Sequence, residues 1–412
     1  MHLSRTEELM LKGEHGSSIQ KAMEILVTVG DIYKASKLID VSSVHISGIS
    51  YRNARESGAK LVEAFASSGR RFVVPTSSNV LGMDATRWAE LGFPEDFVEG
   101  QNRILRSYER MGIVPIHTCT PYYSGCILRS REDVAWAESA ALIFANSVLG
   151  ARTNRESNPT ATSSALTGKT PLYGYHIDEN RAGSILVDVH CELKESSDYS
   201  AVGFCVGSQV GSEVPVFLFK NSKPNIDDLK SLGAALATSG EVALFHVIGI
   251  TPEAKDQKSA FHGDKPIDRI RVNGSDTRQA LQVFFSGSEE VDHVMIGCPH
   301  SSLTELREVA SLLEGKRVHP RVKMWTCTSA AVRSIGERNG VVQMIEKAGA
   351  HVVTDTCTVN VPCKDLGFKT MATSSTKAAK YCSEIDHLNV FVGSLKQCVQ
   401  CAIDGRWNGS VS

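Results

Sequence analysis

The sequence has no excess of charge of either sign. Its 412 residues include 44 Lys and Arg against 46 Asp and Glu, which gives a formal net charge of -2 at pH 7. Proteins that bind DNA or RNA usually carry a basic patch or stripe that neutralises phosphates. Here the basic residues are interspersed with acidic ones along the chain, so we expect no nucleic acid partner.

The sequence also lacks a long uncharged hydrophobic run. The best candidate, residues 135–151, is shorter than the roughly 20 residues of a membrane-spanning helix and contains Glu138. The first residues, MHLSRTEELMLKG, have no signal-peptide core, and Ser4 and Glu7 stand at the spacing of a helix capping box. We therefore expect a cytoplasmic protein with no membrane contact, whose eleven cysteines are reduced thiols or metal ligands.

Several common catalytic motifs are absent as well. The sequence contains no GxGxxG, HExxH or GxSxG pattern. The segment SALTGKT is not a phosphate-binding loop, because Ser163 stands where the first glycine of that motif should be. Any chemistry must therefore rest on other residues.

The hydrophobic pattern predicts an α/β fold with parallel sheets that have helices on both faces. Apolar strand candidates at 41–46, 71–74 and 113–116 alternate with helical spacings, and a second series has strands at 293–296, 322–325 and 351–353. Residues 200–207 predict a further strand, and residues 135–150 and 332–348 predict long helices. The length favours two or more subdomains around a central cleft. We place the first subdomain at residues 1–183 and the second at 184–370, and we expect residues 371–412 to pack back on the cleft.

Four cysteines follow predicted strands, and three of them stand in a Thr-Cys-Thr triplet. They are Cys119, Cys298, Cys327 and Cys357. Because the carboxyl ends of parallel strands meet at one edge of a sheet, cysteines far apart in sequence can converge there. Their separations match no zinc-finger or ferredoxin spacing, so buried packing remains an alternative for each. Cys398 and Cys401 form a CxxC in a helical context and are predicted to be packing residues.

Glu138 is a carboxylate in an otherwise apolar stretch. It could form an ion pair with Arg152 or Arg155. Alternatively it is an acid, or a ligand to a substrate hydroxyl, with a pKa raised by desolvation.

The hydroxyl run Thr373-Ser374-Ser375-Thr376 precedes Lys377 and an apolar helical stretch. Such residues usually cap a helix. The same position could activate a serine as a base, because the positive helix end and Lys377 would stabilise its oxyanion.

Together these blocks resemble one known family. The segments are GEHG, HISGISY, VPTSSNVLGMD, IHTCTPY, AWAESAALIFANSVLGARTNRE, GYHIDENR, GCPHSS, TDTC and TSSTKAAKYC, in this order over nearly the whole chain. They are similar to the large subunit of the aconitase X family. The resemblance implies an aconitase-like fold, an iron–sulfur cluster and a dehydratase reaction. It also implies a separate small subunit, similar to the swivelling domain of aconitase, that completes the site.

The resemblance also implies roles for individual residues. The cluster ligands would be Cys119, Cys298 and Cys357. The substrate pocket would be lined by Gly48, Ile49, Ser50, Asn79, Val80, Glu138 and Ser139, while Ser374 and Ser375 match the hydroxyl motif proposed to act near the proton that is removed. Three thiolates leave one iron with an open position, and such an iron is a Lewis acid for a substrate hydroxyl.

The substrate has two candidates within the family. Asn79-Val80 resembles the cis-3-hydroxy-L-proline dehydratases, whereas HISGISY, RTNRE and HIDENR look more like the archaeal phosphomevalonate branch. We expect dehydration of (R)-5-phosphomevalonate to trans-anhydromevalonate 5-phosphate, with cis-3-hydroxy-L-proline as the alternative. A non-catalytic paralogue and a zinc protein are the remaining hypotheses.

Overall fold

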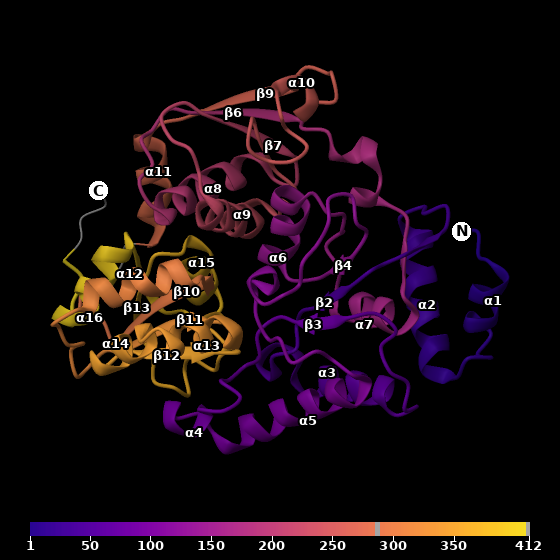
Figure 1. The fold of residues 1–412 in the computed structure, drawn as a ribbon, viewed down its shortest axis with the longest axis horizontal. Coiled ribbons are helices and arrows are strands. Elements are labelled where there is room, and N and C mark those ends of the chain that lie inside the picture. The colour runs from indigo at the N-terminus through magenta and orange to yellow at the C-terminus, as the bar shows by residue number, and fades with distance from the viewer. Residues whose placement is uncertain (285–288, 409–412) are drawn as a thin grey trace.

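The computed structural model describes residues 1–284 and 289–408 and confirms the α/β class. Parts of the second and third predicted segments, residues 285–288 and 409–412, lie outside the described residues. Three parallel sheets and one antiparallel strand pair are flanked by helices. Figure 1 shows the sheets in three groups of elements around a centre occupied by α6 and α15. The segment boundaries near residues 183 and 370 stay predictions.

The first group is built on a three-stranded parallel sheet in the order β3-β2-β4. Its strands are β2 (Val44–Ile46), β3 (Thr76–Ser78) and β4 (Ala135–Trp136), and the pair β1 (Leu38–Asp40) and β5 (Lys169–Pro171) is antiparallel. The helices are α1 (Arg5–Leu11), α2 (Ser17–Ile32), α3 (Tyr51–Ala66), α4 (Trp88–Leu91), α5 (Glu95–Met111), α6 (Ser139–Phe144) and α7 (Asn158–Thr167). The capping box of Ser4 and Glu7 is present at the start of α1.

Two predicted strands of this group are wrong. Residues 71–74 and 113–116 form no strand, and β3 lies instead in the polar Thr76–Ser78. All three of its hydroxyl residues are buried. Two of their hydroxyls have histidine partners: Ser77 Oγ lies 2.9 Å from His45 Nδ1, and Ser78 Oγ lies 2.7 Å from His117 Nδ1. Buried polar side chains are tolerated in a strand when each finds a hydrogen-bond partner.

The predicted helix over residues 135–150 is also wrong as one element. Ala135–Trp136 is the strand β4, α6 follows, and the chain then forms a π-helical turn over Ala145–Leu149. The break between β4 and α6 occurs at Glu138, whose carboxylate Oε2 accepts a hydrogen bond from Ala141 N at 2.6 Å and so caps the helix.

The second group has a four-stranded parallel sheet in the order β8-β7-β6-β9. Its elements are β6 (Ile185–Val189), α8 (Ser196–Val210), β7 (Pro215–Phe219), α9 (Ile226–Gly240), β8 (His246–Val247), α10 (Gln257–Ala260), β9 (Asp268–Val272) and α11 (Gly274–Leu281). The predicted strand at 200–207 is wrong, because these residues belong to α8. Gly203 and Gly207 lie on the face of α8 that contacts α9, where an added Cβ at Gly203 would lie 2.5 Å from Leu232 O.

The third group has a five-stranded parallel sheet in the order β12-β11-β10-β13-β14. Its strands are β10 (His293–Ser301), β11 (Lys323–Thr328), β12 (His351–Thr354), β13 (Thr370–Thr373) and β14 (Asn389–Val392). The helices are α12 (Leu303–Leu313), α13 (Ala330–Arg338), α14 (Val341–Lys347), α15 (Thr376–Glu384) and α16 (Leu395–Asp404). The helix predicted over 332–348 is two helices, because Gly340 adopts a φ of 80° between α13 and α14.

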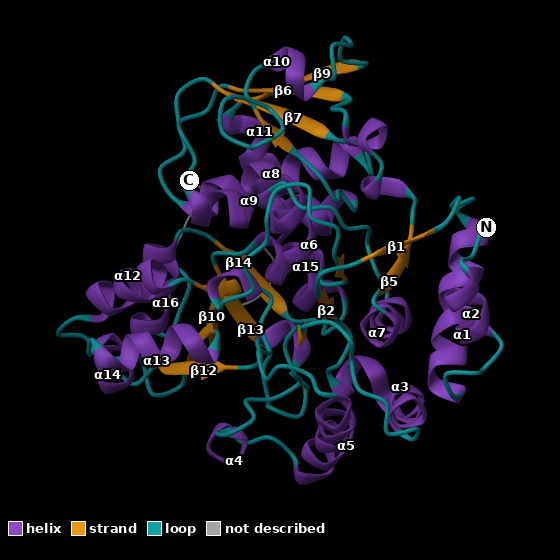
Figure 2. Ribbon diagram, turned by 45° about the vertical axis from the view of Figure 1, so that its right-hand side comes forward, coloured by secondary structure: helices purple, strands orange, loops and turns teal. Residues whose placement is uncertain are grey.

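The helices α6 and α15 lie side by side near the centre in both Figure 1 and Figure 2, although they come from opposite halves of the chain. No described helix is long and apolar enough to cross a membrane. The fold thus gathers the ends of two sheets, with the helices that begin there, in one region.

Candidate functional site

The structure brings all four strand-end cysteines into one neighbourhood. Cys298 lies in β10 and Cys327 in β11, while Cys357 follows β12 and Cys119 lies in the loop after residue 117. Burial raises the pKa of Cys119 well above its ordinary value, and nearby Glu138, Cys357 and Cys298 raise it further. Burial likewise raises the pKa of Cys298 to about 12, and Cys357 adds to this effect.

Polar groups contact the three cysteines that the resemblance selects. His300 N donates to Cys119 Sγ at 3.1 Å, and Asn360 Nδ2 donates to Cys357 Sγ at 3.7 Å. The Ser375 hydroxyl lies near the Cys298 thiol and lowers the pKa of that thiol, against the larger effect of burial. Hydrogen bonds of this kind support metal-bound thiolates and tune iron–sulfur centres.

The donor set therefore fits an iron–sulfur cluster in its chemistry and its burial. Over residues 1–284 and 289–408, no group of three or more His, Cys, Asp and Glu side chains is arranged so that it could hold a metal ion. The structure thus shows soft thiols gathered at one place, without a ready-made coordination geometry. The fourth cysteine of this place, Cys327, is fully buried beside the other three.

Glu138 and Lys377 form a buried ion pair beside these thiols. Lys377 Nζ lies 2.6 Å from Glu138 Oε1 and donates to Ser139 Oγ at 3.1 Å. Burial alone would raise the pKa of Glu138, but the charge and hydrogen bond of Lys377 outweigh it and lower that pKa. Glu138 is thus an ionised carboxylate in this structure, which favours a role as a ligand over a role as an acid.

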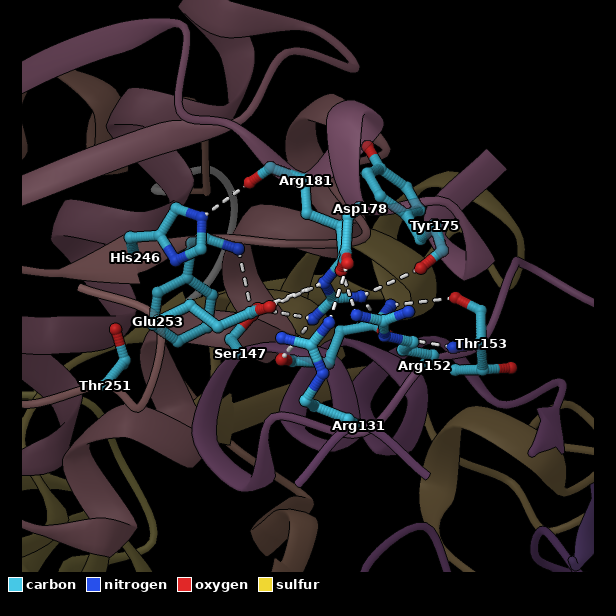
Figure 3. Close-up of polar contacts among 12 residues, drawn as sticks. Arg131, Ser147, Arg152, Thr153, Tyr175, Asp178, Arg181, His246, Thr251 and Glu253 are labelled. Carbon is cyan, nitrogen blue, oxygen red and sulfur yellow. Dashed lines mark hydrogen bonds and ion pairs between the residues drawn. The ribbon is translucent and has the colours of Figure 1, made fainter. Parts of the chain in front are cut away.

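The predicted pairing of Glu138 with Arg152 or Arg155 is wrong. Arg152 pairs with Asp178, which also binds Arg131 at 2.6 Å, and Arg155 pairs with Glu241 at 3.3 Å. Figure 3 shows Arg152 and Arg131 converging on Asp178.

The buried Asn146 of the π-helical turn does not reach the thiols either. Its side chain binds the backbone of Thr153, and its backbone carbonyl oxygen accepts from Arg181 Nη2 at 3.0 Å. Arg181, fully buried and paired with Glu253 at 2.6 Å, thereby fastens the end of this helical segment to the second group of elements (Figure 3).

The hydroxyl motif lies at the start of α15. Ser375 caps α15 by accepting a hydrogen bond from Ala378 N at 3.2 Å, so the capping reading is confirmed. The same hydroxyl lies near Cys298, and Ser374 and Ser375 line a pocket together with this thiol. Three carboxylates, Glu195, Glu305 and Glu308, line other parts of this pocket.

The loops predicted to bind substrate contact the loop that carries Cys357. Ser50 Oγ donates to Asn360 O at 2.8 Å, while Gln101 Nε2 donates to Ile49 O at 3.0 Å. The preceding Gly48 turns the chain with a φ of 70°. These three residues do not line the pocket at Cys298.

The second loop predicted to bind substrate approaches the same region. Asn79 N donates to Ile46 O at 2.7 Å, and the side-chain Oδ1 of Asn79 is buried without a hydrogen-bond partner among the described residues. Val80 is 2% exposed, and the next residue, Leu81, donates from N to Asp355 O at 2.6 Å. An orphaned buried amide oxygen is the kind of group that a bound molecule or water satisfies.

One residue of this region, His300, was not selected as a candidate from the sequence. His300, in GCPHSS, is fully buried, and its ring contacts Thr118 Oγ1 at 2.8 Å and Thr356 O at 3.0 Å. Burial lowers its pKa to about 4, so the ring is neutral. Its position two residues after a strand-end cysteine was the only signal available.

The thiols at the strand ends, the buried Glu138–Lys377 pair and the helix-capping Ser375 thus lie in one region of the fold. Family models match three stretches: aconitase X first domain over residues 1–179, second domain over 183–282 and third domain over 291–404. The chain belongs to the aconitase X family.

Individual relatives cover the chain nearly end to end. The phosphomevalonate dehydratase large subunit of Methanothermobacter thermautotrophicus is 45% identical over 92% of this chain and 94% of its own length. Its counterpart in Methanocaldococcus jannaschii is 41% identical over 97% and 100%. The cis-3-hydroxy-L-proline dehydratase of Pseudomonas aeruginosa is 36% identical over 98% of this chain, which spans 70% of that protein.

A solved structure shares the fold. The crystal structure of Thermococcus kodakaraensis aconitase X in its holo-form superposes with a TM-score of 0.90 at 38% identity, covering 98% of this chain and 100% of that one. The aconitase-like architecture expected from the sequence is thereby confirmed.

Proposed function

We propose that the chain is the large subunit of a hydro-lyase that converts (R)-5-phosphomevalonate to trans-anhydromevalonate 5-phosphate. The observation that supports this substrate is the match to five proteins named phosphomevalonate dehydratase large subunit. Four of them are 39–45% identical over 92–98% of the chain, and the fifth is 32% identical over 93%. Those named cis-3-hydroxy-L-proline dehydratase match at 34–36%, and the chain spans only 70% of their length.

Cys119, Cys298 and Cys357 would hold an iron–sulfur cluster. Their mutual neighbourhood, their burial and the donors on two of the sulfurs support this set. When bound, such a cluster supplies an iron with an open position that polarises the hydroxyl to be lost.

Ser375 would take the proton from the carbon next to the one that bears the hydroxyl. Its oxygen lies at the N-terminus of α15, and Lys377 in the first turn of that helix adds a positive charge. Both favour a deprotonated serine. As the C–H bond breaks, its electrons form the new double bond, and hydroxide leaves from the neighbouring carbon.

Glu138 would act as a substrate contact. Its lowered pKa keeps it an acceptor for a substrate hydroxyl, and Ser139 beside it would hold the Lys377 ammonium in place. Asn79, with its unpartnered amide oxygen, would bind a donor group of the substrate, and Ser374 would line the same pocket as Ser375. Gly48, Ile49, Ser50 and Val80 would shape the wall near Cys357.

A separate small subunit would complete the site. The relatives that match over nearly their full length are named large subunits, which implies a second chain in those proteins. We propose the same assembly here.

The test is co-expression with the candidate small subunit under anaerobic conditions, followed by assays of both substrates. The proposal expects turnover of phosphomevalonate, a brown preparation and an iron–sulfur EPR signal after reduction. Turnover of cis-3-hydroxy-L-proline alone would refute phosphomevalonate as the substrate. A colourless preparation with stoichiometric zinc would refute the cluster.

A further inference from the structure

A buried lysine outside the proposed chemistry joins the second and third groups of elements. Lys230 on α9 is 2% exposed. Its Nζ donates to a carboxylate oxygen of Glu305 on α12, lies 3.1 Å from Asp227 Oδ1 and donates to His300 O at 3.3 Å. An ammonium has three donors, and here each has an acceptor.

Asp227 connects this lysine to the loop that carries Cys119. Its Oδ1 accepts from Tyr123 Oη at 2.8 Å, and its Oδ2 accepts from Ser302 Oγ at 2.8 Å. Tyr123 belongs to the 3-10 turn Pro121–Tyr123 that follows Cys119, and its ring lies 5.6 Å from Lys230 Nζ. The carboxylate therefore holds a side chain from each of the first and third groups.

His300 carries the connection to the thiols. Its backbone N donates to Cys119 Sγ, and it stands two residues after Cys298. Its ring contacts Thr118, beside Cys119, and Thr356, beside Cys357. One residue thus contacts or adjoins all three cysteine loops, and Lys230 holds its carbonyl oxygen.

We propose that Lys230 and Asp227 are positioning residues that fix the cysteine loops relative to one another. Both lie on α9, so the second group of elements would hold the cluster site in shape through them. The proposal rests on the cysteine ligands proposed above. A fully hydrogen-bonded buried network is rigid and specific in geometry, and losing one partner leaves the others unsatisfied. The loops of Cys119 and Cys298 belong to different groups of elements, and this network bridges them.

The sharpest test removes one hydroxyl. Tyr123→Phe deletes the hydrogen bond to Asp227 and keeps the ring. In the full chain without cluster, we expect iodoacetamide to alkylate Cys119 about fivefold faster, the factor that corresponds to one hydrogen bond of about 1 kcal/mol. Cys398, fully buried in α16, is the internal reference whose alkylation rate stays constant. Mass mapping of peptides reports both rates in one sample.

A matched control removes the hydroxyl of a tyrosine in the second group, away from the network. Tyr199→Phe on α8 changes a side chain of equal size that the network does not include. We expect it to leave Cys119 reactivity unchanged. Asp227→Asn is the second variant, and it should accelerate alkylation of Cys119 more than Tyr123→Phe, since it also removes a charge beside Lys230.

A readout in the holo-complex separates positioning from general stability. Tyr123→Phe should speed the loss of cluster absorbance in the presence of a chelator and lower kcat with little change in KM. An unchanged Cys119 rate in both variants would overturn the proposal, and so would equal acceleration at Cys119 and Cys398. Because alkylation needs no substrate, it distinguishes failure of this inference from failure of the proposed substrate.

Discussion

Lys377 Nζ lies 2.6 Å from Glu138 Oε1, and the two residues are 239 positions apart in the sequence. Both side chains are at least nine-tenths buried, and the pair joins the N-terminal ends of α15 and α6. A buried ion pair adds little net stability compared with apolar residues of similar size, whereas removing one partner is costly. Its presence beside the thiols of Cys119, Cys298 and Cys357 therefore points to function.

Lys377→Met is expected to destabilise the chain. The substitution leaves the Glu138 carboxylate buried without a counter-ion, which costs about 3–5 kcal/mol. The pKa of Glu138 should then rise, because only the backbone hydrogen bonds of Ala140 and Ala141 still oppose the effect of burial. Denaturant unfolding measures the first effect, and turnover of the complex should be lost.

The double variant Lys377→Met with Glu138→Gln separates stability from catalysis. It removes both charges, so most of the lost stability should return while turnover stays absent. Recovery of turnover in the double variant would show that the pair is only structural.

Ser375→Ala tests whether the capping serine also takes part in the reaction. Loss of the cap costs about 1 kcal/mol. Loss of a general base lowers kcat by roughly 10²–10⁴-fold. Cluster absorbance should be retained, because Ser375 is not a proposed ligand.

Ser394→Ala is the matched control for this serine. Ser394 caps α16 by accepting from Gln397 N at 3.1 Å and has no part in the proposed site. It should lose a similar free energy of unfolding with normal turnover. Equal kcat values for Ser375→Ala and Ser394→Ala would show that Ser375 only caps its helix.

The cysteine set is tested by single substitutions and by iron and sulfide analysis. Cys298→Ser should abolish the cluster, whereas Cys398→Ser should retain it, since that thiol packs in the core around α16. Cys327→Ser is the informative case: we expect the cluster to remain with three ligands. Loss of iron in this variant would make Cys327 a ligand and contradict the proposed set.

The sequence pattern predicted that the four strand-end cysteines converge, because the carboxyl ends of parallel strands meet at one edge of a sheet, while their role as ligands stays a prediction. Cys119, Cys298 and Cys357 could be selected on that ground together with the family resemblance. The partner of Glu138 could not, since Arg152 and Arg155 are near in sequence while Lys377 comes into contact only through tertiary packing. Pairings of this range depend on the whole fold.

Errors in the elements have similar causes. Thr76–Ser78 looks like a polar loop, yet it forms the strand β3, in which histidines on neighbouring segments are hydrogen-bonded to the hydroxyls of Ser77 and Ser78. The stretch around Gly203 and Gly207 looks like a strand by composition, but both glycines allow α8 to approach α9 closely. In each case a contact from elsewhere in the fold overrides local propensity.

Acid should weaken the five-stranded sheet through His293. This ring is fully buried on β10, with Nδ1 2.8 Å from Lys323 O and Nε2 2.8 Å from Thr358 Oγ1, and it stacks on Phe368 with ring centroids 4.0 Å apart. Burial lowers its pKa from 6.5 to about 3. The unfolded chain therefore binds this proton at a higher pH than the folded chain does.

The sign follows from proton linkage. The stability that a neutral His293 contributes is present above pH 6.5 and is lost as the pH falls toward 3. The loss from this one group amounts to about 1.4 kcal/mol per pH unit within that window.

Hydrogen exchange at the β10 amides, corrected for the intrinsic pH dependence, measures the local opening free energy between pH 7 and pH 5. His293→Gln should lower this energy at pH 7, because the ring contacts are lost, and should make its decline with acid shallower by the same amount per pH unit. Parallel declines in the two proteins would show that His293 is not the titrating group.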